Sequence, residues 1–126
     1  MKNVTLFVAL FMGTLYLSCS PKQETSDNPL MIDFSTPFQA VPFNQIRTEH
    51  FKPAFDAAIQ EARTKLDRII KSKRKPTFGN TIEALEQSGY RLKRIEQIFF
   101  NLNSAETNKE IQKIAQEVSP ILTEYY

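Results

Sequence analysis

Apolar residues recur along three stretches of the chain at the spacing of one helix face. In the first stretch they follow steps of three, four and one residues from Phe51 to Ile70, which is the period of an amphipathic helix. We predict a helix from about Thr48 or Lys52 to Ile70, with Pro53 near its start, because a proline deeper inside costs about 3 kcal/mol. The expected buried face comprises Phe51, Phe55, Ala58, Ile59, Ala62, Leu66, Ile69 and Ile70.

The second stretch predicts a helix from about Thr81 to Asn101. Asn80 followed by Glu83 resembles a capping box that starts it. Gly89 stands where an apolar residue is expected, and a glycine inside a helix costs about 0.5–1 kcal/mol relative to alanine. We expect it to let another backbone approach closely. The buried stripe should comprise Ile82, Leu85, Leu92, Ile95, Ile98, Phe99 and Leu102.

The third helix should begin near Thr107, where Thr107 and Glu110 have the spacing of a capping box. We expect Pro120 to kink or divide it. The chain has only 3 glycines, which favours helices over a turn-rich β fold. The prediction is an all-α fold of about three antiparallel amphipathic helices. The apolar face still continues at Tyr125, so we expect the sequence to be cut short.

An extended Pro- and Phe-rich segment, residues 31–47, precedes the helices. Pro37 and Pro42 interrupt any helix there. We expect large apolar side chains to hold the segment on a protein surface, each contributing about 1.5–3 kcal/mol if fully buried. These side chains are Phe34, Phe38, Phe43 and Ile46.

The N-terminal residues have the pattern of an export signal. Residues 4–17 are nearly all apolar or small and follow the single charge of Lys2. They are shorter than the roughly 20 apolar residues of a membrane span and fit the core of a secretory signal. Ser18 and Cys19 then resemble a bacterial lipobox, although Tyr16 occupies the position where leucine is usual.

The pattern predicts a lipoprotein-type signal at residues 1–18, a lipid on Cys19, a flexible tether at 19–30 and a helical region at 31–126. An ordinary cleaved signal and an uncleaved N-terminal anchor are the alternatives. In the lipoprotein interpretation several acyl chains attach the protein stably to a bacterial membrane. The protein would be exported and would face the periplasm or the cell exterior.

Composition argues against several kinds of site. The net charge of +2 provides no strong field for nucleic acid, and we expect no nucleic-acid partner. We interpret the basic run at 71–75 as a solvated loop at a helix end. One His and one Cys exclude a zinc site built only from these residues. We interpret His50 as a surface or capping residue and Glu83 and Glu86 as solvated carboxylates, so no catalytic or metal-binding residue is assigned.

Six stretches, in this order and spacing, resemble the N-terminal region of the thimet-oligopeptidase-like zinc metallopeptidases. The branch they resemble most is that of the peptidyl-dipeptidases, also called dipeptidyl carboxypeptidases, with oligopeptidase A as its sibling. The resemblance covers about residues 28–126. The stretches are NPL at 28–30, FSTPF at 34–38, VPFNQI at 41–46, EHFKPAFDAAI at 49–59, PTFGNTIEALE at 76–86 and FFNLNSAETN at 99–108.

The resemblance implies an α-helical clamshell whose two lobes enclose a deep channel for short peptides. In the family, zinc is held by an H-E-x-x-H helix and a more distant Glu, and peptidyl-dipeptidases release dipeptides from C-termini. This sequence contains no H-E-x-x-H. We therefore expect an N-terminal fragment that is inactive alone and lacks its C-terminal catalytic portion. Zinc and peptide substrates would belong to the full-length parent.

Two other interpretations remain open. The chain could be a stand-alone lipid-anchored helical bundle that binds a partner, or a purely structural surface protein. A fragment should expose apolar stripes on the second and third helices, because the segments that cover them are missing. A self-sufficient binder should instead have a closed core and polar outer faces.

Overall fold

The computed structural model describes residues 28–126, and the expected signal, Cys19 and most of the tether lie outside them. The described part contains helices and no strand, which confirms the all-α prediction. Its elements are a 3-10 turn η1 (Pro37–Gln39), α1 (Thr48–Ile70), a π-helical turn η2 (Phe78–Glu83), α2 (Ala84–Ser88), α3 (Tyr90–Ala105) and α4 (Lys109–Tyr125).

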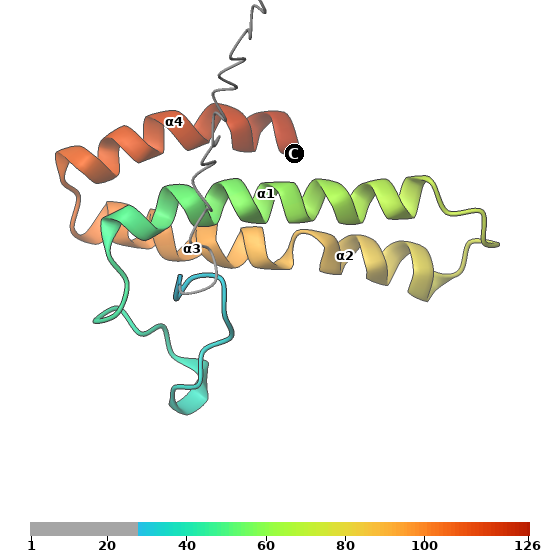
Figure 1. Cartoon of the computed structure of the whole chain (residues 1–126), viewed down its shortest axis with the longest axis horizontal. Coiled ribbons are helices and arrows are strands. Elements are labelled where there is room, and N and C mark those ends of the chain that lie inside the picture. Colours follow the sequence, from blue (N-terminus) through green and yellow to red (C-terminus); the bar gives the residue numbers. More distant parts are fainter. Residues whose placement is uncertain (1–27) are drawn as a thin grey trace, which may run out of the picture.

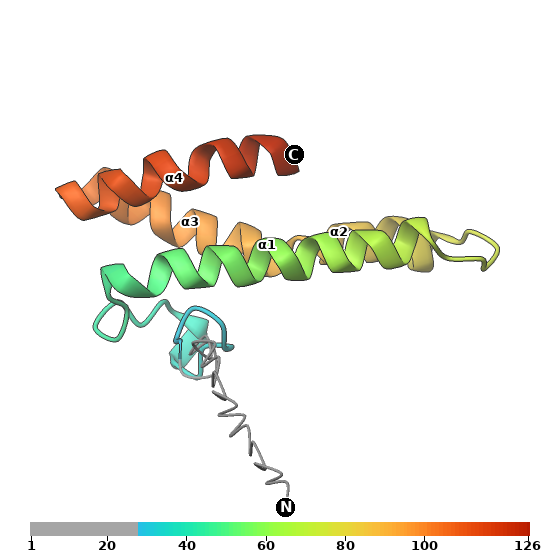
Figure 2. The same ribbon diagram turned by 45° about the horizontal axis from the view of Figure 1, so that its top comes forward.

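The helices run antiparallel, as predicted. α1 runs out to the loop at residues 71–77, and η2, α2 and α3 return along it as the second arm of a hairpin (Figure 1). α4 turns back again and lies along the half of the hairpin that is remote from this loop (Figure 2). The half nearer the loop therefore consists of two helical layers only.

The core lies where α1, α3 and α4 meet. The ring of Phe99 on α3 contacts Phe51 and Phe55 on α1 edge to face, with centroids 5.0 and 5.4 Å apart. Apolar groups packed this closely supply most of the free energy of folding. The fully or nearly fully buried side chains are Leu30, Phe51, Ala54, Phe55, Ala58, Ile59, Ala62, Leu92, Ile95, Ile98, Phe99, Ile111, Val118 and Leu122.

α1 begins and ends as predicted, but both expected capping boxes are wrong. At the second helix the cap is Thr77. Its Oγ1 accepts from the Asn80 backbone N–H at 3.2 Å, and the Asn80 side chain accepts from the Thr77 N–H at 2.9 Å. The helical turns therefore start at Phe78. At α4 the cap is Asn108, whose side chain accepts from two backbone N–H groups at 3.0 and 2.9 Å.

The predicted second helix is divided at Gly89, where φ is −96° and ψ is 3°. The buried hydroxyl of Ser88 donates to the Leu85 carbonyl at 2.7 Å, a local bond that competes with helix geometry at this point. A Cβ on Gly89 would lie 3.2 Å from the Tyr125 hydroxyl oxygen. The close neighbour is therefore a side chain of α4 and not, as expected, another backbone. Pro120, in contrast, does not divide α4.

Gly89→Ala should respond to the residue at position 125. The Gly89 φ suits any L-residue, and Gly→Ala in such a conformation stabilises by about 0.4–1 kcal/mol. We expect that gain in a Tyr125→Phe background, where the hydroxyl is absent, and a smaller gain or a loss with Tyr125 present. Urea unfolding of the wild type, the two single variants and the double variant measures the coupling free energy between positions 89 and 125. Identical effects in both backgrounds would show that the hydroxyl does not press on this site.

The segment before α1 is held differently from the prediction. Phe34 and Ile46 pack against the core, but Phe38 is fully exposed and Phe43 is 51% exposed. Phe38 sits in the η1 turn with a φ of 57°, and the chain reversal there turns its ring to solvent. Leu30, expected in the flexible tether, is instead 0% exposed. The packed part of the chain thus includes residues 28–30.

Candidate functional site

The residues singled out for chemistry do not come together. Among residues 28–126, no three His, Cys, Asp or Glu side chains lie close enough to hold a metal ion. Glu83 and Glu86 are exposed on η2 and α2. Cys19, the expected lipidation site, lies outside the described residues. The described region therefore does not fit the zinc that the family resemblance implies.

His50 helps to cap α1. Its Nδ1 accepts the Arg47 backbone N–H at 3.1 Å, while its Nε2 lies 3.3 Å from the Arg47 guanidinium. The guanidinium also pairs with Glu49 at 2.7 Å. Hydrogen bonding to its own backbone N–H, and then to Arg47, lowers the pKa of Glu49. These contacts hold the first turn of α1, as expected for a capping His.

The most connected polar group in the described region is Arg94 on α3. Its Nη2 donates to the carbonyls of Leu30 at 3.2 Å and Ile32 at 2.9 Å. Its Nη1 pairs with Asp33 at 3.1 Å, and its guanidinium carbon lies 4.8 Å from the centroid of the Phe34 ring. A planar guanidinium can serve several acceptors at once, so one side chain holds the N-terminal segment on the helix.

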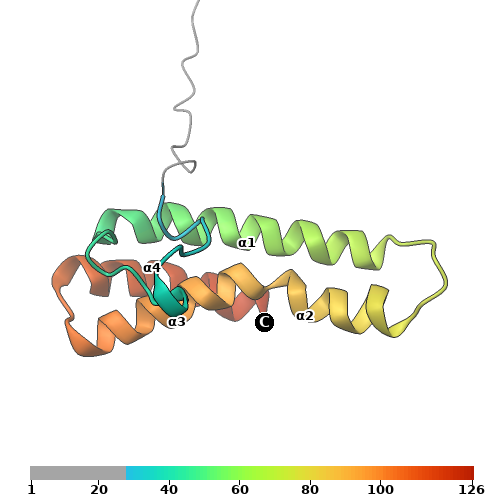
Figure 3. The same cartoon turned by 90° about the horizontal axis from the view of Figure 1, so that it is seen from below.

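Arg91, one helical turn earlier, makes a second connection to the same segment. Its Nη1 donates to the Met31 carbonyl, and its Nε pairs with Glu61 of α1 at 2.8 Å. Burial opposes ionisation of Glu61, but a hydrogen bond from Lys65 and the charge of Arg91 outweigh it, so the pKa of Glu61 is lowered. Arg91 thus links α1, α3 and the N-terminal segment, which lies across these two neighbouring helices (Figure 3).

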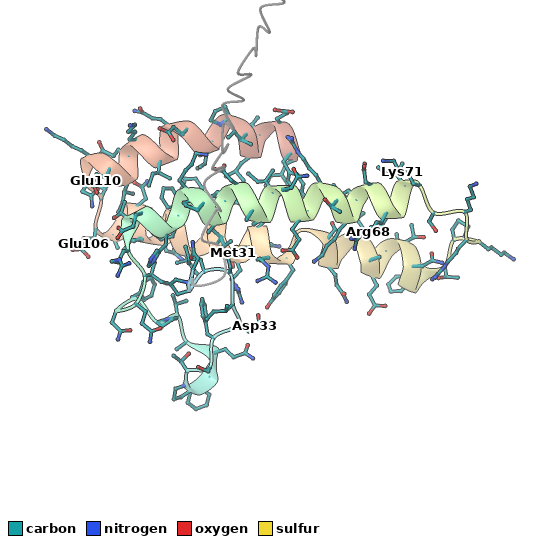
Figure 4. All side chains as sticks on the ribbon, in the orientation of Figure 1. Met31, Asp33, Arg68, Lys71, Glu106 and Glu110 are labelled. Atoms are coloured by element: carbon teal, nitrogen blue, oxygen red, sulfur yellow. The ribbon has the colours of Figure 1, made fainter. Side chains whose placement is uncertain are left out.

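We call Arg91 and Arg94 the arginine clamp. Figure 4 labels Met31 and Asp33 of the segment that it holds. Sequence reasoning missed this pair, although both residues flank the predicted buried stripe. Their partners on the segment lie 60–64 residues away along the chain, a separation that helical periodicity does not detect. The only available signal is two arginines placed three residues apart beside buried positions.

Two open grooves flank the N-terminal segment. One, of about 480 Å³, lies between the segment and α3 and is lined by Phe34, Val41, Tyr90, Arg94 and Gln97 among others. The other, of about 520 Å³, lies at the corner of α1, α3 and α4, beside Ile46, Leu102 and Ile111. Neither lining contains His or Cys. Grooves with such mixed apolar and polar linings can accept a packing partner.

Within residues 28–126, no helix is both long enough and apolar enough to span a bilayer. The described helical region has a packed core and an N-terminal segment that the arginine clamp holds on α3.

Comparison with known proteins shows the family to which the chain belongs. No family model matches the chain. The chain is 39% identical over 100 residues to the dipeptidyl carboxypeptidase of Escherichia coli. The matched residues make up 79% of this chain and 15% of that enzyme. The chain belongs to the thimet oligopeptidase family. It is also 38% identical over 94 residues to the dipeptidyl carboxypeptidase of Salmonella typhimurium, and 31% identical over 98 residues to oligopeptidase A of E. coli.

The resemblance found in the six stretches is thereby confirmed. The matches cover 75% and 78% of this chain but only 14% of each of these two relatives. The chain thus spans about a seventh of the length of the relatives it matches, and corresponds to a peptidase-family fragment.

Proposed function

We propose that this chain is the N-terminal part of a zinc peptidase that releases dipeptides from the C-termini of short peptides. The observation that carries the proposal is the match to E. coli dipeptidyl carboxypeptidase, 39% identical over 79% of the chain. Identity to the three bacterial oligopeptidases A is lower, at 29–33%. The identities therefore favour the dipeptidyl carboxypeptidases over the oligopeptidases A.

In this proposal the described helices form part of the wall of the peptide chamber and contribute no catalytic group. No metal-holding cluster occurs within residues 28–126, so zinc would be bound by residues of the parent outside this region. The contribution of the described helices is rigidity. A three-helix core and the arginine clamp hold a surface in place, against which the rest of the enzyme packs.

The exposed apolar side chains favour this proposal over a self-sufficient binder. Ile82 and Leu85 are 49% and 50% exposed on η2 and α2, where a fragment is expected to show an uncovered stripe. The same expectation is wrong for α4, whose residues Val118 and Leu122 are buried against the core. The uncovered apolar side chains therefore lie on η2 and α2, and the proposal rests on that end of the hairpin.

A chimera tests the proposal. The matching segment of E. coli dipeptidyl carboxypeptidase is replaced by residues 28–126, and release of dipeptides from a blocked short peptide is followed. We expect the chimera to be active, within about tenfold of the parent enzyme, or roughly 1.4 kcal/mol in transition-state stabilisation. The chain alone, with zinc supplied, should release none.

Variants sharpen the test. Ile82→Asp with Leu85→Asp should leave the chain alone folded, because both side chains are half exposed, but should inactivate the chimera if this stripe contacts the rest of the enzyme. Lys109→Asp, an exposed change at the start of α4, is the control and should leave the chimera active. A zinc-loaded but inactive chimera, or chelator-sensitive release of dipeptides by the pure chain, would refute the proposal.

We also propose that the chain is exported and carries lipid on Cys19. The support is the sequence alone: an apolar core at residues 4–17 followed by the only Cys of the chain. Expression in a bacterial host with labelled palmitate should yield a labelled product, and Cys19→Ser should lose the label. Equal labelling of the variant, or an unlabelled wild type, would contradict the lipidation.

A further inference from the structure

The loop that joins α1 to η2 carries a concentrated positive charge. Residues 68–82 contain five basic residues and no acidic one, although the whole chain has a net charge of only +2. Every residue from 71 to 79 is exposed. Lys71 is paired with Asp67 at 2.6 Å, whereas Lys73, Arg74 and Lys75 form no ion pair within residues 28–126. Three successive cations therefore face solvent.

Two large apolar side chains flank these cations. Ile70, the last residue of α1, is 77% exposed, and Phe78, the first residue of η2, is 75% exposed. Between them the loop has a turn at Lys71 and a bend at Arg74, and Pro76 disfavours helix there. In the sequence the run showed no interleaved aromatic residue. The fold brings one apolar group to each side of it.

The loop forms one end of the long axis of the molecule. α4 and the N-terminal segment both lie at the other half (Figure 1). Figure 4 shows Arg68 on the last turn of α1 and Lys71 just after the helix, close to this end. Residues 70–78, which we call the basic tip, can therefore touch a flat surface without interference from the rest of the fold.

We propose that the basic tip binds the surface of an anionic lipid bilayer. Lys and Arg side chains are attracted to anionic headgroups, and neighbouring apolar side chains enter the boundary between headgroups and acyl chains. Electrostatic attraction and apolar insertion are each weak alone, and together they give stronger binding. This inference goes beyond the proposed peptidase function and does not depend on it, since it concerns only the exposed groups of the tip.

A bilayer accounts for the tip better than a nucleic acid does. A nucleic-acid site uses cations on phosphates together with aromatic rings that stack on bases or an element that enters a groove. The tip has a single ring, Phe78, and its second apolar group is the aliphatic Ile70, which has no partner on a phosphate backbone. Both side chains have a place in a bilayer interface.

The chain contains no Trp, so a single introduced Trp is a specific probe of the tip. The full-length Phe78→Trp variant is mixed with vesicles of phosphatidylcholine, with or without phosphatidylglycerol. We expect a blue shift of the emission with phosphatidylglycerol that high salt abolishes. Adding Lys73→Glu, Arg74→Glu and Lys75→Glu should weaken vesicle binding about tenfold or more. Far-UV circular dichroism verifies that these exposed changes leave the fold intact.

Phe38→Trp is the matched control. Phe38 is also an exposed phenylalanine, but it lies in η1 at a distance from the tip, so its Trp emission should not shift. Because residues 4–17 can themselves enter a bilayer, only a shift that requires both anionic lipid and the tip cations supports the proposal. An equal shift on neutral vesicles, an equal shift from position 38, or a shift with polyglutamate or nucleic acid but not with anionic vesicles would overturn it.

Discussion

Replacing Phe99 with alanine should lower the free energy of unfolding by about 3–5 kcal/mol. The side chain is 0% exposed, and its ring centroid lies 5.0–5.4 Å from those of Phe51, Phe55 and Phe100 in edge-to-face contacts. The variant loses the burial of one ring, leaves a cavity between α1 and α3, and removes three aromatic contacts. Since a small domain has only about 5–15 kcal/mol of total stability, we expect a large fraction to be lost.

Phe38→Ala is the control for this prediction. It makes the same chemical change at a side chain that is fully exposed on η1. Its effect should stay within about 0.5 kcal/mol. Urea unfolding followed by far-UV circular dichroism compares the two variants. Similar midpoints for both would mean that the ring of Phe99 does not lie at the centre of the core.

Arg94→Ala should cost about 2–3 kcal/mol, because hydrogen bonds to charged groups are each worth about 1.5–3 kcal/mol and the carbonyls of Leu30 and Ile32 lose their donor. The substitution should lower the stability of the whole domain and also loosen the N-terminal segment locally. Without the Arg94 guanidinium, the segment at residues 31–46 keeps only the Arg91 bond to Met31 and its apolar packing, and it should be cut faster by proteases. Limited proteolysis with mass spectrometry locates the new cuts.

Two further variants separate the clamp from a simple charge effect. Arg94→Lys keeps the charge but lacks the planar fork that reaches two carbonyls and Asp33 together, so most of the loss should remain. Arg63→Ala removes an exposed pair with Glu124 and should cost less than about 1 kcal/mol. If Arg63→Ala and Arg94→Ala had equal effects on proteolysis of the segment, the clamp would have no special role.

Helical periodicity predicted α1 and the inner half of the second stretch well, because burial against one neighbour imposes the same period on the sequence. α1 runs from Thr48 to Ile70 as predicted, and Leu92, Ile95, Ile98 and Phe99 are all buried on α3. The prediction is wrong near the α1–η2 loop, where Ile70, Ile82 and Leu85 were expected on buried faces but are exposed. The family resemblance, based on six short stretches, was also sufficient to identify the relatives.

Helix starts were harder to predict because several capping side chains compete within a few residues. Thr77 and Asn80, or Thr107 and Asn108, offer the same chemistry, and the choice depends on which backbone leaves the helix first. The prediction that Phe38 packs on the protein surface was wrong because a hydrophobicity pattern does not reveal the left-handed backbone conformation at this residue. The arginine clamp depends on tertiary contacts between distant residues, which no local pattern contains.

The uneven distribution of the core has a consequence for motion. No residue of α1 beyond Ala62 is buried, and Ser88 is the only buried residue of η2 and α2. The break at Gly89 separates this lightly packed end from α3. Backbone amides near the α1–η2 loop should therefore exchange with solvent through partial opening of the hairpin, while those around Phe55 and Phe99 exchange only when the whole domain unfolds. One continuous helix, α1, thus belongs to two units of different stability.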